Sequence, residues 1–299
     1  MSAEAQFDPR EVRRAFDQAA SSYDAHAAMQ REIGRRLAER LDYMKLAPRA
    51  VLDLGCGTGF ALPELRARYP DAQLTALDLA PAMLAAARAR LPRPGLLDRL
   101  KGRPGCDFVC ADLQRLPFAA SRFDLLWSSL ALQWANDLDA AIREAHRALA
   151  PGGLFLFATF GPDTLKELRR AFSAVDEQPH VSRFVDLHDI GDSLVHAGFA
   201  SPVMEMEMLT LTYADLKSLM RDLKGLGAHN ASAARGHGLF GRRAWARLEA
   251  AYEENRRDGR LPATFEVIYG HAWAGDKTRR EDGRQVIEFK IAERKFRGH

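Results

Sequence analysis

The sequence is poor in the features of membrane, secreted and disulfide-stapled proteins. Its three cysteines among 299 residues are an odd number and too few for a disulfide framework, so we expect a reduced, cytoplasmic setting. Apolar stretches such as Leu154–Phe160 are far shorter than the roughly 18 residues that a membrane-spanning helix needs. The first residues also lack the apolar segment of a secretory signal, so we expect neither a membrane anchor nor export.

The sequence also has little net charge and lacks the residue spacings of metal sites. Lys and Arg number 43 against 40 Asp and Glu, and a net charge of +3 falls short of the basic excess of nucleic-acid-binding proteins. No spacing of Cys and His is typical of a zinc site, and no set of two histidines and one carboxylate can be assembled for iron. We therefore predict neither a metal nor a nucleic-acid partner.

What the sequence does contain is an alternation of apolar strands and amphipathic helices. Strands are predicted over 50–54, 73–77, 108–111, 123–128 and 153–160, and helices over 60–69, 81–91 and 138–149. Strands that alternate with helices form a parallel sheet covered on both faces. The runs 203–212 and 264–272 supply two more strands. The predicted fold class is α/β: a doubly wound, mostly parallel, seven-stranded sheet.

The segments that flank this core are predicted to be helical caps. Apolar residues recur at every fourth position from Met29 to Leu41, which predicts helix through the first 45 residues. Further helices are expected from Pro162, up to Gly198 and through most of 213–262. We expect one domain over 1–299: an N-terminal cap (1–45), a core (46–160), lid and substrate-side elements (161–273), and a charged tail (274–299) with a candidate strand at 286–291.

A glycine-rich loop directly follows the first predicted strand. Residues 51–59 read VLDLGCGTG and place glycines at 55, 57 and 59. Ligands of doubly wound sheets bind at the carboxyl ends of the strands, where glycine lets the backbone approach them closely. The spacing of Gly55, Gly57 and Gly59 differs from the G-x-G-x-x-G of dinucleotide binders. Asp53 would repel a pyrophosphate, but it would attract an ammonium or sulfonium group.

Two further carboxylates follow the next two strands. Asp78, at the end of the second strand, can accept hydrogen bonds from both ribose hydroxyls. Asp112, after the third, can accept from an adenine amino group, while the Leu113 N–H donates to a ring nitrogen. Each alone could be a helix cap or a turn residue. Three carboxylates at successive strand ends, however, describe a site for S-adenosylmethionine better than one for a nicotinamide dinucleotide.

These motifs resemble those of class I S-adenosylmethionine-dependent methyltransferases. The resemblance rests on VLDLGCGTG and on LDLA (77–80), ADLQRLPF (111–118), FDLLWSSLALQW (123–134) and LAPGGLFLF (149–157). It implies that S-adenosylmethionine is the cofactor and that S-adenosylhomocysteine is its product. It also adds Leu79, Met83 and Gln133 to the residues expected to contact this cofactor.

The flanking segments resemble a narrower family, the malonyl-acyl-carrier-protein O-methyltransferases of biotin synthesis. The motifs are residues 16–30, QPHVSRF (178–184), LKGLGA (223–228) and YGHAW (269–273), so the resemblance reaches residue 273. It implies methyl transfer to the free carboxylate of a malonyl thioester, with malonyl-bearing acyl carrier protein as the partner. The group also contains a mitochondrial complex I assembly factor described as an arginine hydroxylase.

The implied reaction calls for a cation rather than a general base. A malonyl carboxylate is already ionised at pH 7, but burying it without a partner would be prohibitive. Arginine suits it best because its planar fork binds a carboxylate through two hydrogen bonds. Arg183 in the QPHVSRF segment is one candidate, and Arg221 with Lys224 on one predicted helix face is another. Each could instead be a solvated surface residue.

Aromatic and polar residues of the cap are candidates for the donor side of the site. Tyr23 is expected to close over the sulfonium, unless it only packs on the core. His26 and Gln30 lie on about the same predicted helix face and either contact the ligands or serve the structure. Trp134, beside Gln133 after the fourth strand, is a substrate-proximal or a core residue.

An acidic carrier protein needs a basic docking surface. The candidates lie close together in the predicted helical insertion: Arg235, Arg242, Arg243 and Arg247. A solvated helix face is the alternative for this cluster. Because methyl transfer benefits from excluding water, we also expect part of the flanking segments to act as a lid.

Two other functions remain open on the sequence. The first is a class I methyltransferase that acts on another small molecule, such as a quinone precursor, which would not need Arg183. The second is an S-adenosylmethionine-binding assembly factor or arginine hydroxylase of the complex I type.

Overall fold

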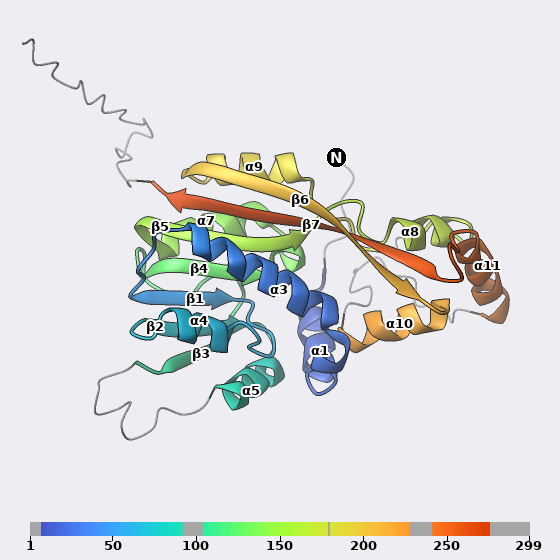
Figure 1. Cartoon of the computed structure of the whole chain (residues 1–299), viewed down its shortest axis with the longest axis horizontal. Coiled ribbons are helices and arrows are strands. Elements are labelled where there is room, and N and C mark those ends of the chain that lie inside the picture. The colour runs from blue at the N-terminus through green and yellow to red at the C-terminus, as the bar shows by residue number, and fades with distance from the viewer. Residues whose placement is uncertain (1–6, 92–103, 179, 228–240, 276–299) are drawn as a thin grey trace, which may run out of the picture.

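A seven-stranded sheet in the order β3-β2-β1-β4-β5-β7-β6 forms the centre of the structure (Figure 1). The computed structural model describes residues 7–91, 104–178, 180–227 and 241–275. The first five strands are parallel, and β7 runs antiparallel to both of its neighbours. This confirms the predicted fold class. The strands are β1 (Ala50–Leu54), β2 (Gln73–Asp78), β3 (Cys106–Cys110), β4 (Phe123–Ser129), β5 (Leu149–Phe160), β6 (Phe199–Tyr213) and β7 (Leu261–Ala274).

Helices cover both faces of the sheet. Ile33 and Leu37 of α3 are fully buried in the core on one face, and Ile142 of α7 and Leu194 of α9 are fully buried on the other. None of the helices in the described part of the chain is long and apolar enough to cross a membrane. The helices are α1 (Pro9–Ala19), α2 (Tyr23–His26), α3 (Ala28–Arg40), η1 (Leu41–Tyr43), α4 (Leu62–Arg68), α5 (Pro81–Arg90), η2 (Leu132–Trp134), α7 (Leu138–Ala148), α8 (Lys166–Ser173), α9 (Leu187–His196), α10 (Leu216–Gly225) and α11 (Arg242–Glu253).

The N-terminal cap is not the continuous helix that the apolar spacing predicted. It is broken into α1, α2 and α3. The first break comes at Ser22, whose N–H and hydroxyl both donate to the Ala19 carbonyl and end α1. The second comes at Ala27, whose backbone (φ −88°, ψ 31°) leaves the helical region. As a result, Tyr23 and His26 lie on a short separate turn, while Gln30 belongs to the next helix.

Several other predicted boundaries differ, three of them with consequences for the fold. β5 begins at Leu149, so the LAPGG segment is part of the strand and not a loop before it. α8 begins at Lys166 and not at Pro162, because Leu165 before it adopts a left-handed backbone (φ 54°). β7 begins at Leu261, three residues before the prediction. The candidate strand at 286–291 lies outside the described residues.

The two longest strands reach past the end of the shorter strands of the sheet. β6 and β7 pair along nearly their whole length, from Phe199 with Ala274 to Tyr213 with Leu261. Figure 1 shows this pair extending beyond the shorter strands to α8, α10 and α11, at the end where the parallel strands finish. The cap helix α1 lies at the same end (Figure 1). The fold thus gathers the cap and the helices α8, α10 and α11 at the end of the sheet where β1 to β4 finish.

Candidate functional site

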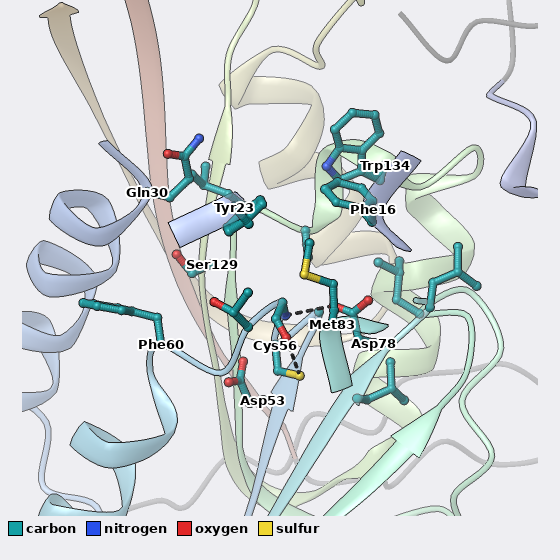
Figure 2. Close-up of a pocket in the computed structure, with 18 of the residues that line it drawn as sticks. Phe16, Tyr23, Gln30, Asp53, Cys56, Phe60, Asp78, Met83, Ser129 and Trp134 are labelled. Carbon is teal, nitrogen blue, oxygen red and sulfur yellow. Dashed lines mark hydrogen bonds between the residues drawn. The ribbon is translucent and has the colours of Figure 1, made fainter. Parts of the chain in front are cut away.

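A cavity lies at the carboxyl ends of the central strands, between them and the N-terminal cap (Figure 2). It occupies about 1190 Å³, including its open mouth. Its lining comes from the cap, the glycine loop after β1, the ends of β2 and β3, and the segment after β4. The chain order reverses between β1 and β4, so the cavity lies where doubly wound folds bind their ligands.

The three glycines of the loop all have positive φ, and the surroundings of each one differ. Gly57 (φ 52°) lines the cavity, and a Cβ there would meet nothing within 4 Å, so its backbone is open to a ligand. A Cβ on Gly55 (φ 77°) would lie 2.2 Å from the Ala131 Cβ. Gly59 (φ 76°) does not line the cavity; its Cβ would lie 2.7 Å from that of Ala87 on α5. It therefore serves helix packing rather than ligand contact.

Asp78 holds the glycine loop in place at the end of β2. One carboxylate oxygen accepts from the Gly57 N–H at 2.8 Å, and the other from the Ala80 N–H at 2.9 Å. Burial raises the pKa of Asp78 to about 6 against the opposing effect of these backbone hydrogen bonds. Each oxygen keeps a further lone pair, so the carboxylate can still accept from two hydroxyl groups of a ligand.

Asp53 is the group that most clearly lacks a partner. Its side chain is 3% exposed, it lines the cavity, and its Oδ2 has no hydrogen-bond partner in the described part of the chain. Burial, followed by repulsion from Asp78, raises its pKa to about 8. A buried carboxylate in this state is stabilised by a cationic ligand. The site therefore fits the ammonium-bearing methionine end of S-adenosylmethionine.

The end of β3 supplies the predicted Asp112 and Leu113, and both line the cavity. Asp112 also closes a turn, since its Oδ1 accepts from the Gln114 N–H at 2.8 Å. Leu79 and the buried Met83 line the same region. The structure therefore brings these four residues together with Asp53 and Asp78.

The cap forms the opposite wall of the cavity. Figure 2 shows Tyr23, Phe16 and Trp134 on the side away from Asp53. Trp134 packs edge-on against Phe16, with ring centroids 5.1 Å apart, and against Phe7 at 5.4 Å. Burial, and less strongly the charge of Asp78, raise the pKa of Tyr23, so its hydroxyl stays protonated. Phe16 is a site residue that the sequence reasoning missed, because one aromatic residue on a helix carries no signal of its own.

Polar contacts fasten α2 to the glycine loop. The Asp24 carboxylate accepts from the Thr58 hydroxyl at 2.7 Å and pairs with the Arg90 guanidinium. Arg90 Nε also donates to the Thr58 carbonyl oxygen at 3.0 Å. These contacts hold Tyr23, the neighbour of Asp24, over the glycine loop.

A second set of contacts fastens the cap to α10. His26 Nδ1 lies 3.0 Å from Asp222 Oδ1, and His26 does not line the cavity. A Cβ on Gly225 would lie 2.2 Å from the His26 ring. Gly227 (φ 69°) similarly approaches the Ala15 carbonyl of α1. The two glycines of the LKGLGA segment are therefore a docking point for the cap, and His26 has a structural contact.

The predicted basic residues and Gln133 are not part of the cavity lining. Arg183, Arg221 and Lys224 are exposed. Gln133 has both ends of its amide occupied: Nε2 donates to the Leu130 carbonyl at 2.8 Å, and Oε1 accepts from a threonine hydroxyl of β5 at 3.2 Å. Of the docking candidates, Arg242, Arg243 and Arg247 are exposed on α11, and Arg235 lies outside the described residues.

Within the described ranges, no group of three or more His, Cys, Asp or Glu side chains is arranged to hold a metal ion. The three cysteines are free thiols. Burial raises the pKa of the Cys56 thiol well above its usual value and that of Cys106 to about 12, so neither is poised as a nucleophile.

Comparisons with known sequences agree with this geometry. A family model described as a methyltransferase domain matches residues 52–157. The malonyl-[acyl-carrier protein] O-methyltransferase of Laribacter hongkongensis is 56% identical over 285 residues, which cover 94% of this chain and 96% of that protein. The enzyme of the same name from Gallionella capsiferriformans is 52% identical over 288 residues, covering 95% and 98%.

Comparisons with solved structures support the fold. The YcgJ protein of Bacillus subtilis has a TM-score of 0.55 at 17% identity, and the match covers 80% of this chain and 98% of that one. A putative methyltransferase of Bacillus halodurans has the same score and coverage at 19% identity. At these identities the similarity concerns the fold alone.

Proposed function

This chain belongs to the family of malonyl-[acyl-carrier protein] O-methyltransferases, and we propose that it methylates the free carboxylate of a malonyl thioester on acyl carrier protein. It is an S-adenosylmethionine-dependent O-methyltransferase. The observation that carries the choice of acceptor is the extent of the match, since relatives of this name align over 94% and 95% of the chain. The product would be the malonyl methyl ester that begins pimeloyl synthesis for biotin, and we place the reaction in the cytoplasm.

The cofactor would lie along the edge formed by the ends of four neighbouring strands. Asp112 and Leu113 follow β3 at the adenine end, Asp78 ends β2 at the ribose, and Asp53 on β1 meets the ammonium group. Strands lie about 4.8 Å apart, so β3 to β4 spans about 14 Å, which suits an extended adenosylmethionine. When bound, S-adenosylmethionine supplies an electrophilic methyl group on its sulfonium. Tyr23 on the cap would cover that end of the cavity and exclude water.

For the acceptor, the chain has to provide charge and alignment rather than a base. A malonyl carboxylate is ionised at neutral pH, and the leaving group is a neutral thioether. Arg183 is our first candidate for its binding partner. It is exposed, and its charge is near enough to Arg169 to affect it: burial lowers the pKa of Arg169, the Asp163 carboxylate opposes this, and Arg183 adds a smaller lowering effect. Two like charges held together favour an anion between them. Arg221 and Lys224 on α10 are further candidates.

The carrier protein would dock on the basic residues of α11. Arg242 and Arg243 open this helix, and Arg247 follows one turn later. Cations are unfavourable at a helix N-terminus, so the first two gain little from their own helix and are available to an acidic partner. Reversing both charges to Glu should raise KM for the carrier-bound substrate, and an unchanged KM would refute docking at this place.

The test of the acceptor is methyl transfer to purified malonyl-carrier protein, read by mass spectrometry of the intact carrier. We expect a gain of one methyl group on the malonyl form and none on the acetyl form, which lacks the free carboxylate. Arg183→Ala should raise KM for malonyl-carrier at least tenfold, while the affinity for S-adenosylhomocysteine stays unchanged. Arg170→Ala, an exposed arginine of α8, is the matched control. Cofactor binding without methylation of the malonyl form would refute the acceptor.

A further inference from the structure

The charges around the cavity are strongly one-sided. Among the described residues that line it, four carry a carboxylate and one carries a cation, Arg31. The carboxylates are Asp24, Asp53, Asp78 and Asp112. Any ligand that brings its own carboxylate into this cavity therefore meets one guanidinium and a surplus of negative charge. Burying such a group without a cation would be prohibitive.

Arg31 is held at the cavity but keeps most of its donors available. It lies in the first turn of α3 and is half-buried. Its Nη1 donates to the carbonyl oxygen of Asp24 at 2.5 Å, and this is the only hydrogen bond of its guanidinium within the described part of the chain. A guanidinium has five donors, so a two-pronged contact with a carboxylate remains open to it. The Asp24 side chain in turn contacts Thr58 and Arg90, so the residue that holds the Arg31 guanidinium is itself held in place.

The position of Arg31 along the sheet edge indicates which end of the cofactor it faces. Gly34, three positions on and therefore on the same helix face, also lines the cavity. A Cβ on Gly34 would lie 3.8 Å from the hydroxyl of Ser129 at the end of β4. Beside β4 lies β1 with Asp53, while the adenine end belongs to β3 on the far side. Arg31 therefore lies at the methionine end.

We propose that Arg31 binds the α-carboxylate of S-adenosylmethionine, opposite the Asp53 carboxylate that meets the ammonium group on the same carbon. Arg31 and Asp53 would then bind the two opposite charges of the methionine end, the carboxylate and the ammonium group. This assignment rests on the methyl donor and not on the identity of the acceptor, so it can fail or stand independently of the malonyl proposal. A malonyl carboxylate is the other anion that could reach Arg31, and the experiment separates the two.

The test is calorimetric binding of S-adenosylhomocysteine and of decarboxylated S-adenosylmethionine to the full chain and to Arg31→Gln. We expect Arg31→Gln to weaken S-adenosylhomocysteine about 10- to 100-fold. The decarboxylated analogue should bind both proteins equally, because it lacks the group that Arg31 contacts. Arg31→Lys should restore part of the affinity. Arg35→Gln, one turn further along α3 and paired with Glu32 and Glu39, is the matched control and should change nothing.

Two outcomes would overturn the assignment. If S-adenosylhomocysteine binds Arg31→Gln as tightly as the wild type while KM for the malonyl acceptor rises, Arg31 serves the acceptor carboxylate. If both ligands weaken by the same factor, Arg31 only supports the α2 turn through the Asp24 carbonyl.

Discussion

Replacing Asp53 by asparagine should abolish cofactor binding and remove a pH-dependent instability of the cofactor-free protein. Asp53 is 3% exposed, its Oδ2 has no partner in the described part of the chain, and its pKa is raised to about 8 by burial and by Asp78. Such a carboxyl opposes folding at every pH at which the unfolded chain would ionise it. Asparagine has nearly the same shape and does not titrate.

The magnitude follows from the two pKa values. In the unfolded chain the carboxyl releases its proton at about pH 3.8, and in the folded chain only at about pH 8. Between them the folded state holds the extra proton, so the free energy of unfolding falls by about 1.4 kcal/mol per pH unit. From pH 5 to pH 7 the wild type should lose about 3 kcal/mol that Asp53→Asn does not lose. The stability that the protonated Asp53 carboxyl contributes to the folded state is fully present below pH 3.8 and is lost as the pH rises through 8.

The assay is urea unfolding of both proteins at pH 5, 6, 7 and 8, followed by tryptophan fluorescence. The stability of Asp53→Asn minus that of the wild type should grow with each step. Asp107→Asn removes an exposed carboxylate from the same sheet and controls for the loss of one charge. A difference that stays constant from pH 5 to 8 would mean that Asp53 is already ionised in the cofactor-free protein, and would refute the reasoning.

Three other variants test the packing and the cap. Gly59→Ala forces a Cβ to within 2.8 Å of the Ala87 Cα at φ 76°, so it should destabilise the protein by about 2 kcal/mol or more; an unchanged midpoint of unfolding would contradict this. Gly225→Ala places a Cβ 2.2 Å from the His26 ring, so we expect faster proteolysis of the cap and lower activity. An intact cap with full activity would show that the His26 ring moves aside at little cost. Tyr23→Phe should lower kcat about tenfold at unchanged stability if the hydroxyl acts at the sulfonium, whereas unchanged kcat would leave it a packing role.

The edge of the sheet that we propose for the cofactor could be predicted from the sequence because its determinants are local. Asp53, Asp78 and Asp112 each stand in or next to a short apolar run, and parallel strands bring their carboxyl ends to one edge in any arrangement of the helices. The same holds for Gly57, whose neighbours in the chain place it at the end of a strand. Pattern alone therefore predicted that these residues lie together, and the structure places them around one cavity.

The cap and the acceptor side were decided by contacts between distant parts of the chain. His26 and Asp222 are 196 positions apart, and their contact helps to dock α2 against α10. The breaks at Ser22 and Ala27 then turn Tyr23 toward the cavity and leave His26 outside it. Periodicity could not separate these two residues, since a period identifies a face and not what the face meets.

The sequence by itself thus determined the order of strands and helices in the sheet and the residues at the ends of its strands, because strand pattern and loop composition are properties of neighbouring residues. The family followed from the resemblance of its motifs. Only the tertiary structure decided which cation lies at the cavity. Arg183, Arg221 and Lys224 are the basic residues that the sequence analysis selected for the acceptor, but among the described residues Arg31 is the cation that the packing of α3 beside β4 brings to the cavity lining. Charge can be read along the chain, whereas proximity depends on how the helices pack on the sheet.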